Sequence, residues 1–289
     1  MPLKNPSQYF LRRAETKDHS KLSGFFASTP RMHRHLDWHP PIDWLGSQPF
    51  WLVESEQRIV AALALPPDPP RVAWVRVFAC SPLVNPIEYW DALFEKCLED
   101  LGTQPETIIP SLVLSDWYLA LLRHSGFEHY QNIVGLEREI RAEEKEYQAN
   151  PDLFIRLMDV DDLDAVAEID QGAFEPIWQH SRLQVQESFE QAALATVAEL
   201  GDQIVGYQIS TVNMFSAHLA RLAVKPGATQ RHIGSDILLD LFKRCKSERL
   251  WQITVNTQNT NSASLNLYKK TGFRETGEEF PVFIFQQFA

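Results

Sequence analysis

The chain has 289 residues, of which 44% are hydrophobic and 22% are charged, and its net charge is −11. This composition is typical of a globular protein and excludes the collagen, coiled-coil and disordered classes. The excess of acidic residues argues against a nucleic-acid partner, and no apolar run reaches the roughly 18 residues of a membrane-spanning helix.

A charged stretch, residues 137–146, runs into Asn150-Pro151 and divides the chain into two halves. It predicts the end of a strand followed by an exposed linker. Beyond the linker we expect a strand at residues 153–158 and a helix at residues 161–171. The helix follows an acidic cluster, residues 159–162, and negative side chains favour a helix N-terminus.

The second half continues with strands at residues 194–200, 204–213 and 218–224. A helix over residues 235–245 follows, with apolar side chains on one face. A strand at residues 251–255 precedes a short helix at residues 262–270, which Gly272 ends, and the last strands cover residues 274–286. This order predicts an α+β fold in which helices cover a mixed α/β sheet.

Four segments of the first half recur in the second half at a nearly constant offset. The matched pairs are residues 10–13 with 154–157, residues 54–60 with 199–205, residues 75–79 with 220–224, and residues 125–127 with 271–273. Four matches in order indicate an internal repeat. We therefore expect two copies of one domain, residues 1–145 and 146–289, each of ordinary domain size.

Residues 222–235 combine the end of a strand, a loop with Gly227 and the start of a helix at Gly234. The first turn of a helix offers unpaired backbone N–H groups and the positive end of the helix dipole, which together bind phosphate. Glycine lets the backbone approach a ligand closely. An ordinary glycine-containing loop is the alternative interpretation.

Residues 261–273 contain Asn261, Ala263, Tyr268 and the pair Gly272-Phe273. Together with the preceding loop, this segment resembles the GNAT superfamily of N-acetyltransferases, which move an acetyl group from acetyl-coenzyme A to an amine. The resemblance extends from Phe154 to about Phe285. It implies two tandem acyl-CoA N-acyltransferase-like domains, with acetyl-coenzyme A as co-substrate and no metal.

The resemblance also implies roles for individual residues. The strand residues Leu222, Ala223 and Val224 would bind the pantetheine arm, and Asn261 would face it. The phosphates would lie on the loop and helix start, which comprise Thr229, Gln230, Arg231, His232, Ile233, Gly234 and Ser235. In the family pattern His232 replaces the first glycine of this loop.

Tyr268 would be the general acid. Attack of an amine on a thioester expels a thiolate, whose parent thiol has a pKa of about 8.5, and a phenol can hydrogen-bond and reprotonate it. An aromatic side chain packed on the sheet is the alternative. For the general base we take Glu175 from four acidic candidates, each of which is otherwise a solvated acid: Glu168, Asp170, Glu175 and Glu199.

The first copy lacks these features. The segment that corresponds to the phosphate loop contains Pro86 and Glu88 and no glycine, Leu122 stands opposite Tyr268, and Ser115 stands opposite Asn261. Proline removes an N–H donor and a carboxylate repels phosphate. We therefore expect a degenerate first copy and a working site in the second.

Function and setting follow as expectations. We expect an N-acetyltransferase in which a small-molecule or peptide amine attacks directly; an acyl-CoA-binding sensor and a purely structural protein are the alternatives. The three cysteines are odd in number and widely spaced, and the first residues contain no apolar signal segment, which favours a cytoplasmic protein. Two fused copies can mimic a dimer, which favours a monomer. The histidines His33, His35 and His39 have no convincing metal-ligand spacing.

Overall fold

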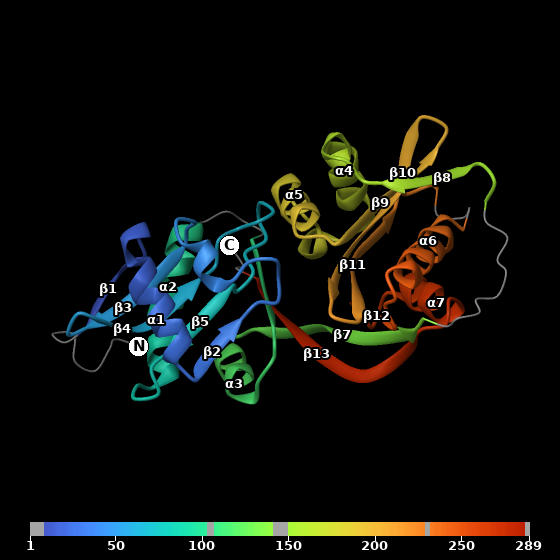
Figure 1. The fold of residues 1–289 in the computed structure, drawn as a ribbon. Coiled ribbons are helices and arrows are strands. Elements are labelled where there is room, and N and C mark those ends of the chain that lie inside the picture. Colours follow the sequence, from blue (N-terminus) through green and yellow to red (C-terminus); the bar gives the residue numbers. More distant parts are fainter. Residues whose placement is uncertain (1–8, 103–106, 141–149, 229–231, 287–289) are drawn as a thin grey trace. The chain divides into compact units, whose positions relative to one another are not determined.

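A computed structural model describes residues 9–102, 107–140, 150–228 and 232–286. The chain divides into two compact units, which we call unit 1 (residues 1–130 and 280–289) and unit 2 (residues 131–279) (Figure 1). The predicted α+β fold with a mixed sheet is confirmed. No helix within the described ranges is both long enough and apolar enough to cross a membrane.

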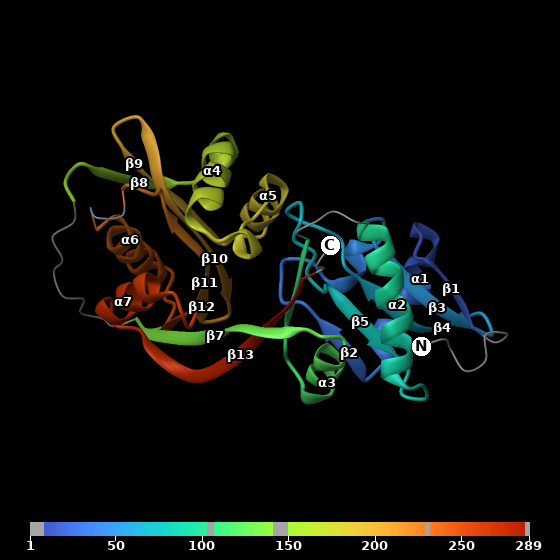
Figure 2. The same ribbon diagram turned by 180° about the vertical axis from the view of Figure 1, so that it is seen from behind.

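Unit 1 follows a strand and helix order that the second unit repeats. Its elements are β1 (Phe10–Arg13), η1 (Thr16–Asp18), α1 (His19–Ser28), β2 (Arg31–Arg34), η2 (Pro41–Trp44), β3 (Phe50–Ser55), β4 (Arg58–Ala64), β5 (Val77–Cys80), α2 (Pro86–Leu101), β6 (Ile108–Leu112) and α3 (Asp116–His124). Five strands form a sheet in the order β1-β3-β4-β5-β2. Helices α1 and α2 lie on opposite faces of this sheet (Figures 1 and 2).

Unit 2 contains the longer strands. Its elements are β7 (Glu128–Glu139), which starts in unit 1, β8 (Leu153–Leu157), η3 (Val160–Asp162), α4 (Leu163–Ala173), η4 (Pro176–Trp178), α5 (Arg182–Glu190), β9 (Leu194–Leu200), β10 (Gln203–Asn213), β11 (Ser216–Val224), α6 (Ile233–Ser247), β12 (Gln252–Gln258), α7 (Ser262–Lys270) and β13 (Arg274–Gln286). Neighbouring strands follow the order β7-β12-β11-β10-β9-β8.

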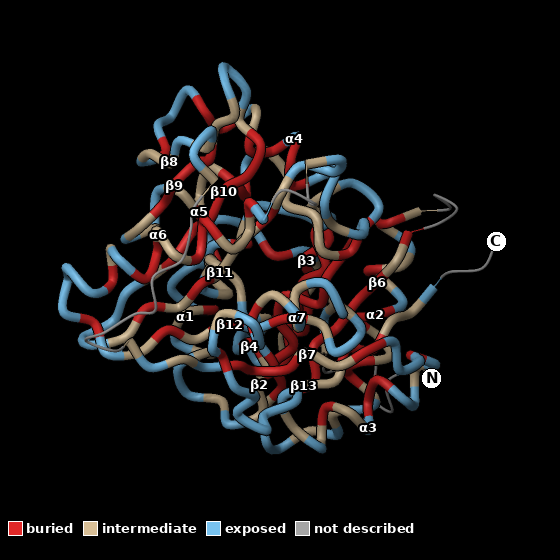
Figure 3. Tube along the Cα trace, turned by 90° about the vertical axis from the view of Figure 1, so that its right-hand side faces the viewer, coloured by how far each residue is buried: buried red, intermediate tan, exposed pale blue. Residues whose placement is uncertain are grey.

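The sheet of unit 2 has helices on both faces. Helices α4 and α5 lie on one face, and α6 and α7 lie on the other (Figures 1 and 2). The apolar core on the second face joins the α6 residues Leu238, Leu241 and Phe242 to Leu219 of β11 and Val255 of β12. Buried residues follow the strands and the helix sides packed on them, and the connecting turns are exposed (Figure 3).

The last strand of each sequence repeat is divided between the units. Residues 133–139 of β7, which end the first repeat, pair with β12 in unit 2. Residues 282–286 of β13, which end the second repeat, pair with β6 in unit 1. The boundaries of the compact units therefore differ from those of the sequence repeats, because each unit is completed by a strand from the other repeat.

The two copies share a polar arrangement beside their first strands. In unit 1 Arg12 binds Asp18 at 2.6 Å and Glu54 at 2.9 Å. In unit 2 Arg156 binds both Asp162 and Glu199 at 2.6 Å. The three residues of each set lie 144 or 145 positions apart along the chain, so the predicted repeat is supported by contacts as well as by sequence.

The predicted elements of the second half are present, with ends that differ by three residues at most, and β13 is one continuous strand. Helix α5 was not among the elements expected from the sequence. The signal was Ser181 with Gln184, a reciprocal capping box that marks a helix N-terminus.

Candidate active site

Strands β11 and β12 separate before they end. They are parallel neighbours over four residue pairs, from Ser216 with Gln252 to Leu219 with Val255. Beyond these pairs β11 continues to Val224 and β12 continues to Gln258. The register of β11 also shifts against β10 next to Ala220, and such a bulge bends a strand. The last residues of β11 therefore have an edge without a strand partner.

Backbone groups of Leu222 and Val224 face this unpaired edge. The N–H of Lys225 donates to the carbonyl oxygen of Val205 at 2.8 Å, so Lys225 points toward β10. Because backbone groups alternate in direction along an antiparallel strand, those of Ala223 point the same way and those of Leu222 and Val224 point away. The edge thus offers N–H and C=O groups to an extended ligand.

Helix α6 begins directly after β11 and its loop. The N–H groups of Ser235 and Asp236 donate to the carbonyl oxygen of His232 at 2.9 and 3.1 Å, so those of Ile233 and Gly234 have no intrahelical acceptor. A Cβ atom on Gly234 would lie 3.1 Å from Cδ2 of Leu267. Glycine therefore allows the start of α6 to pack closely on α7. The predicted Thr229, Gln230 and Arg231 lie outside the described residues.

Tyr268 lies on α7, beside β12. Its side chain is 4% exposed and belongs to the core cluster that contains Val255, and its ring centre lies 5.4 Å from that of Phe273. Burial raises the pKa of Tyr268 above its usual range, so the phenol remains protonated at neutral pH. No described residue forms a hydrogen bond with its hydroxyl group.

Asn261 is the N-cap residue of α7. Its Oδ1 accepts from the N–H of Ser264 at 3.0 Å, and its Nδ2 donates to Oε1 of Gln258 at 3.3 Å. The side-chain oxygen is therefore occupied by the helix cap. Its backbone holds the start of α7 next to the end of β12, since its N–H donates to the carbonyl oxygen of Gln258.

Two of the four acidic candidates for the general base are in ion pairs. Asp170 binds Arg221 and Glu199 binds Arg156. Glu168 and Glu175 are exposed. Residues 174–181 lie between α4 and α5, and we call them the acceptor loop. Within this loop Glu175 is the N-cap residue of η4. Its proposed role stays a prediction.

His218 was not among the site residues expected from the sequence. This residue lies on β11 next to the last β11–β12 pair, and its neighbours Ala217 and Leu219 pack toward α6. Because side chains alternate along a strand, His218 faces the side of the sheet that α4 covers. Its Nδ1 lies 2.9 Å from Oγ1 of Thr254. Burial lowers the pKa of His218, which favours the neutral imidazole.

In unit 1 a strand fills the corresponding position. There the residues that lead into β5 run parallel to β6. This contact ends at Val75, whose N–H donates to the carbonyl oxygen of Pro110. Beyond it β5 pairs antiparallel with β2, from Val77 with Arg34 to Cys80 with Arg31. By the repeat offset, residues 77–79 correspond to residues 222–224. Strand β2 therefore occupies the edge that is unpaired in unit 2.

The helix start in unit 1 also has fewer free donors. Pro86, the first residue of α2, has no N–H, and the N–H of Ile87 donates to Oδ1 of Asn85 at 3.2 Å. His33 on β2 is buried, stacks on Tyr118 with ring centres 3.9 Å apart, and contacts the carbonyl oxygen of Val75 at 3.2 Å. These contacts support the expected loss of ligand binding in the first copy.

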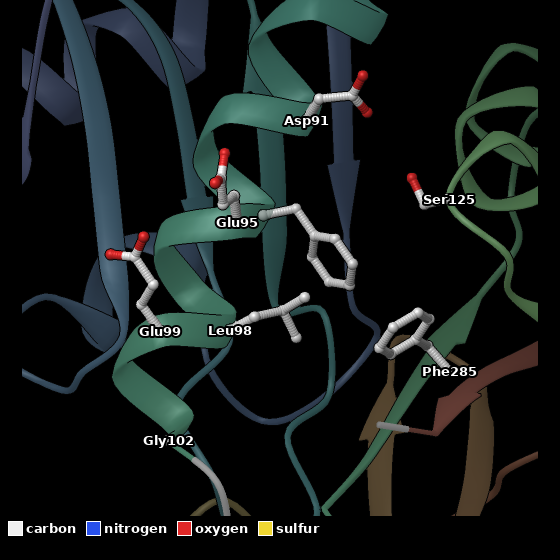
Figure 4. Close-up of a pocket in the computed structure, with 8 residues that line it drawn as sticks. Asp91, Glu95, Leu98, Glu99, Gly102, Ser125 and Phe285 are labelled. Carbon is white, nitrogen blue, oxygen red and sulfur yellow. The ribbon is translucent and has the colours of Figure 1, made fainter. Parts of the chain in front are cut away.

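A groove of about 520 Å³ lies elsewhere in unit 1, along α2 (Figure 4). Asp91, Glu95 and Glu99 border it, and the rings of Phe94 and Phe285, with centres 5.3 Å apart, form its apolar part. Within the described ranges, no three His, Cys, Asp or Glu side chains are grouped to hold a metal ion.

Comparison with known proteins shows the fold and a family to which part of the chain is similar. Residues 163–273 match the model of the acetyltransferase (GNAT) family. A protein of Bacillus subtilis (strain 168), provisionally named ribosomal protein bS18-alanine N-acetyltransferase, is 24% identical over 123 residues. That match covers 43% of this chain and 82% of the relative.

Two solved structures resemble nearly the whole chain. A GCN5-related N-acetyltransferase from Sphaerobacter thermophilus has a TM-score of 0.62 and 13% identity, and the match covers 98% of each chain. A tandem GNAT protein from the clavulanic acid biosynthesis pathway has a TM-score of 0.61 and 13% identity, over 96% of this chain and 98% of that one. Both likenesses concern the fold, which comprises two GNAT-like domains. Residues 163–273 are therefore similar to the acetyltransferase (GNAT) family, and the fold of the chain is that of two GNAT-like domains.

Proposed function

We propose that this chain is an N-acetyltransferase that transfers the acetyl group of acetyl-coenzyme A to a primary amine at a site in its C-terminal half. The main support is the separation of β11 from β12 after Leu219 and Val255, which leaves the backbone groups of Leu222 and Val224 for the pantetheine arm. We also propose that the two sequence repeats comprise residues 1–145 and 146–289.

The start of α6 suits the phosphates of the co-substrate. The N–H groups of Ile233 and Gly234 have no intrahelical acceptor, and the helix dipole adds a positive field at the same point. The loop residues Thr229 to His232 would complete this site. The site requires main-chain donors more than particular side chains, so the replacement of a glycine by His232 is compatible with it.

Proton transfer is assigned to two residues on opposite faces of the sheet. His218 accepts a proton from the ammonium form of the acceptor through Nε2, and the neutral amine attacks the thioester carbonyl carbon. As the carbon–sulfur bond breaks, Tyr268 donates its hydroxyl proton to the departing sulfur. The second proton of the amine nitrogen, lost as the amide forms, restores the Tyr268 hydroxyl group. The products are the N-acetyl amine and the free thiol, and the proton held by His218 is released to water.

His218 suits the base role better than Glu175 for a geometric reason. The imidazole is held on the sheet next to the separation of β11 and β12, whereas Glu175 is exposed on a loop. Burial already favours the neutral, proton-accepting form of His218. Glu175 remains the alternative base, which a pair of variants can distinguish.

The acceptor is proposed to be a small molecule or a peptide with a free amine. The net charge of −11 favours a cationic acceptor over a nucleic acid. The name of the Bacillus subtilis relative refers to the alanine amine of a ribosomal protein, so a peptide with an N-terminal alanine belongs among the acceptors to be tested. The free, buried cysteines Cys80, Cys97 and Cys245 fit the proposed cytoplasmic setting, and we propose a monomer.

The decisive experiment measures thiol release from acetyl-coenzyme A by the full chain with polyamines, amino sugars and short peptides. We expect release that depends on one class of amine. Binding of acetyl-coenzyme A without turnover on any of these amines would favour the acyl-CoA sensor. Absence of binding would overturn the proposal.

A further inference from the structure

A fully buried carboxylate lies beneath the acceptor loop. Asp170, at the end of α4, is 0% exposed. Its Oδ2 accepts hydrogen bonds from the Tyr207 hydroxyl and from Nε of Arg221, the latter at 2.7 Å. Its Oδ1 accepts from Nη2 of Arg221 at 2.8 Å and from the N–H of His180 at 2.7 Å. Both oxygens of this carboxylate thus accept hydrogen bonds, and the donors belong to β10, β11 and the acceptor loop.

Arg221 binds the same loop at two further points. Its Nη2 donates to the carbonyl oxygen of Trp178, and its guanidinium carbon lies 3.9 Å from the ring centre of Phe174. Arg221 is the first residue of β11 after the bulge, directly before Leu222. The acceptor loop is therefore attached to the strand segment whose outer edge is proposed to bind the pantetheine arm.

Unit 1 contains a comparable arrangement at the corresponding strand position. Arg76, 145 residues before Arg221, has a buried side chain that binds Asp37 at 2.9 Å and the carbonyl oxygen of Asp68 at 3.1 Å. Its guanidinium carbon lies 4.4 Å from a ring centre of Trp44. In unit 1, however, β2 occupies the outer edge of the strand. Only in unit 2 does the arginine connect a loop to a strand with an open edge.

We propose that Arg221 and Asp170 are positioning residues that hold the acceptor loop at a fixed distance from the thioester end of the co-substrate. This inference rests on the proposed function. A bidentate arginine–carboxylate pair fixes both distance and orientation, and neither lysine nor asparagine can reproduce all of its bonds. The pair therefore determines how well the amine is placed, while the backbone groups of Leu222 and Val224 bind acetyl-coenzyme A independently.

Arg221→Lys and Asp170→Asn test the proposal in the full chain, with Arg76→Lys as the matched control. Hydrogen exchange without any substrate is measured first over residues 174–181. We expect exchange at the His180 amide to rise about 10-fold or more in both unit 2 variants. With acceptor present, we expect KM for the amine to rise about 10-fold to 100-fold, on the scale of a misplaced reactant, and the Kd for acetyl-coenzyme A to stay within about threefold.

Tyr207→Phe provides a milder variant, because it removes one donor and keeps the Arg221–Asp170 pair. We expect it to raise KM by less than either charge variant does.

Unchanged exchange at residues 174–181 in the charge variants would overturn the proposal. So would an equal rise in KM in Arg76→Lys, or parallel losses of amine and acetyl-coenzyme A affinity, because both indicate general destabilisation. If the wild-type chain acetylates no amine, the proposed function fails, whereas the exchange and Kd measurements still decide whether the pair holds the loop.

Discussion

Nδ1 of His218 and Oγ1 of Thr254 lie 2.9 Å apart, on the two strands whose separation forms the proposed site. This contact fixes one nitrogen of the imidazole and leaves Nε2 for an acceptor amine. Burial lowers the pKa of His218, so its neutral form persists below the ordinary value of about 6.5.

His218→Gln is expected to lower kcat/KM by about 10²-fold to 10⁴-fold, the usual contribution of a general base. In the wild-type chain, kcat/KM falls as the pH drops through the lowered pKa of His218, because the protonated ring cannot accept a proton. The variant should lose this decline. Profiles of kcat/KM between pH 5 and 9 measure both effects.

Glu175→Gln is the comparison for that experiment. If His218 is the base, this variant keeps the acidic decline and most of the activity. A profile in which Glu175→Gln abolishes the decline while His218→Gln retains it would assign the base to Glu175 instead.

Tyr268→Phe is expected to lower kcat by about 10-fold to 100-fold, within the range of acid assistance to a leaving group. The Kd for acetyl-coenzyme A should hardly change, because the ring and its contact with Phe273 remain. Rapid-quench kinetics and titration calorimetry measure the two quantities. Tyr118→Phe, which removes a buried hydroxyl bonded to Ser111 in unit 1, is the control and should retain kcat. Equal rates in the Tyr268 variant and wild type at every pH would remove this residue from the mechanism.

The full chain is expected to bind one molecule of coenzyme A. In unit 1 strand β2 pairs with the edge of β5 that corresponds to the open edge of β11, and Pro86 and Asn85 leave few donors at the start of α2. Calorimetry or native mass spectrometry gives the stoichiometry. Two bound molecules per chain would show that β2 can be displaced, and would contradict the assignment of a single site.

Several parts of the fold and site were predictable because local sequence determines them. Gly272 follows Thr271, the C-cap residue of α7, with a φ of 93°, and a left-handed position at a helix end is a strong local signal for glycine. The repeat located both copies, and the chain order of strands and helices determined the fold class. The signature from Asn261 to Phe273 likewise lies within one short helix and its cap.

The remaining features depend on residues that are distant in the chain. Nothing near His218 in the sequence indicates that Thr254 will face it, and Arg221 meets Asp170 across 51 positions. The filling of the unit 1 edge by β2 depends on pairing residues 31–34 with residues 77–80. Such non-local pairing follows from packing of the whole sheet, which single-sequence periodicity does not record.

His33 makes the stability of unit 1 depend on pH. Its side chain is 3% exposed, and burial lowers the pKa of His33 to about 3, whereas an unfolded histidine titrates near 6.5. Between these values the unfolded chain binds a proton that the native chain excludes. The contribution of neutral His33 is therefore fully present above pH 6.5 and declines by about 1.4 kcal/mol per pH unit as the pH falls toward 3.

His33→Gln, which keeps an amide near the carbonyl oxygen of Val75, should remove this slope. Denaturant unfolding measures the free energy of unfolding at pH 7 and at pH 5. Between these pH values the wild type should lose about 2 kcal/mol more than the variant, because the contributions of groups that titrate in both proteins cancel. The exposed His19→Gln is the control and should behave as wild type does. Identical losses in His33→Gln and wild type would mean that unit 1 accommodates a charged His33.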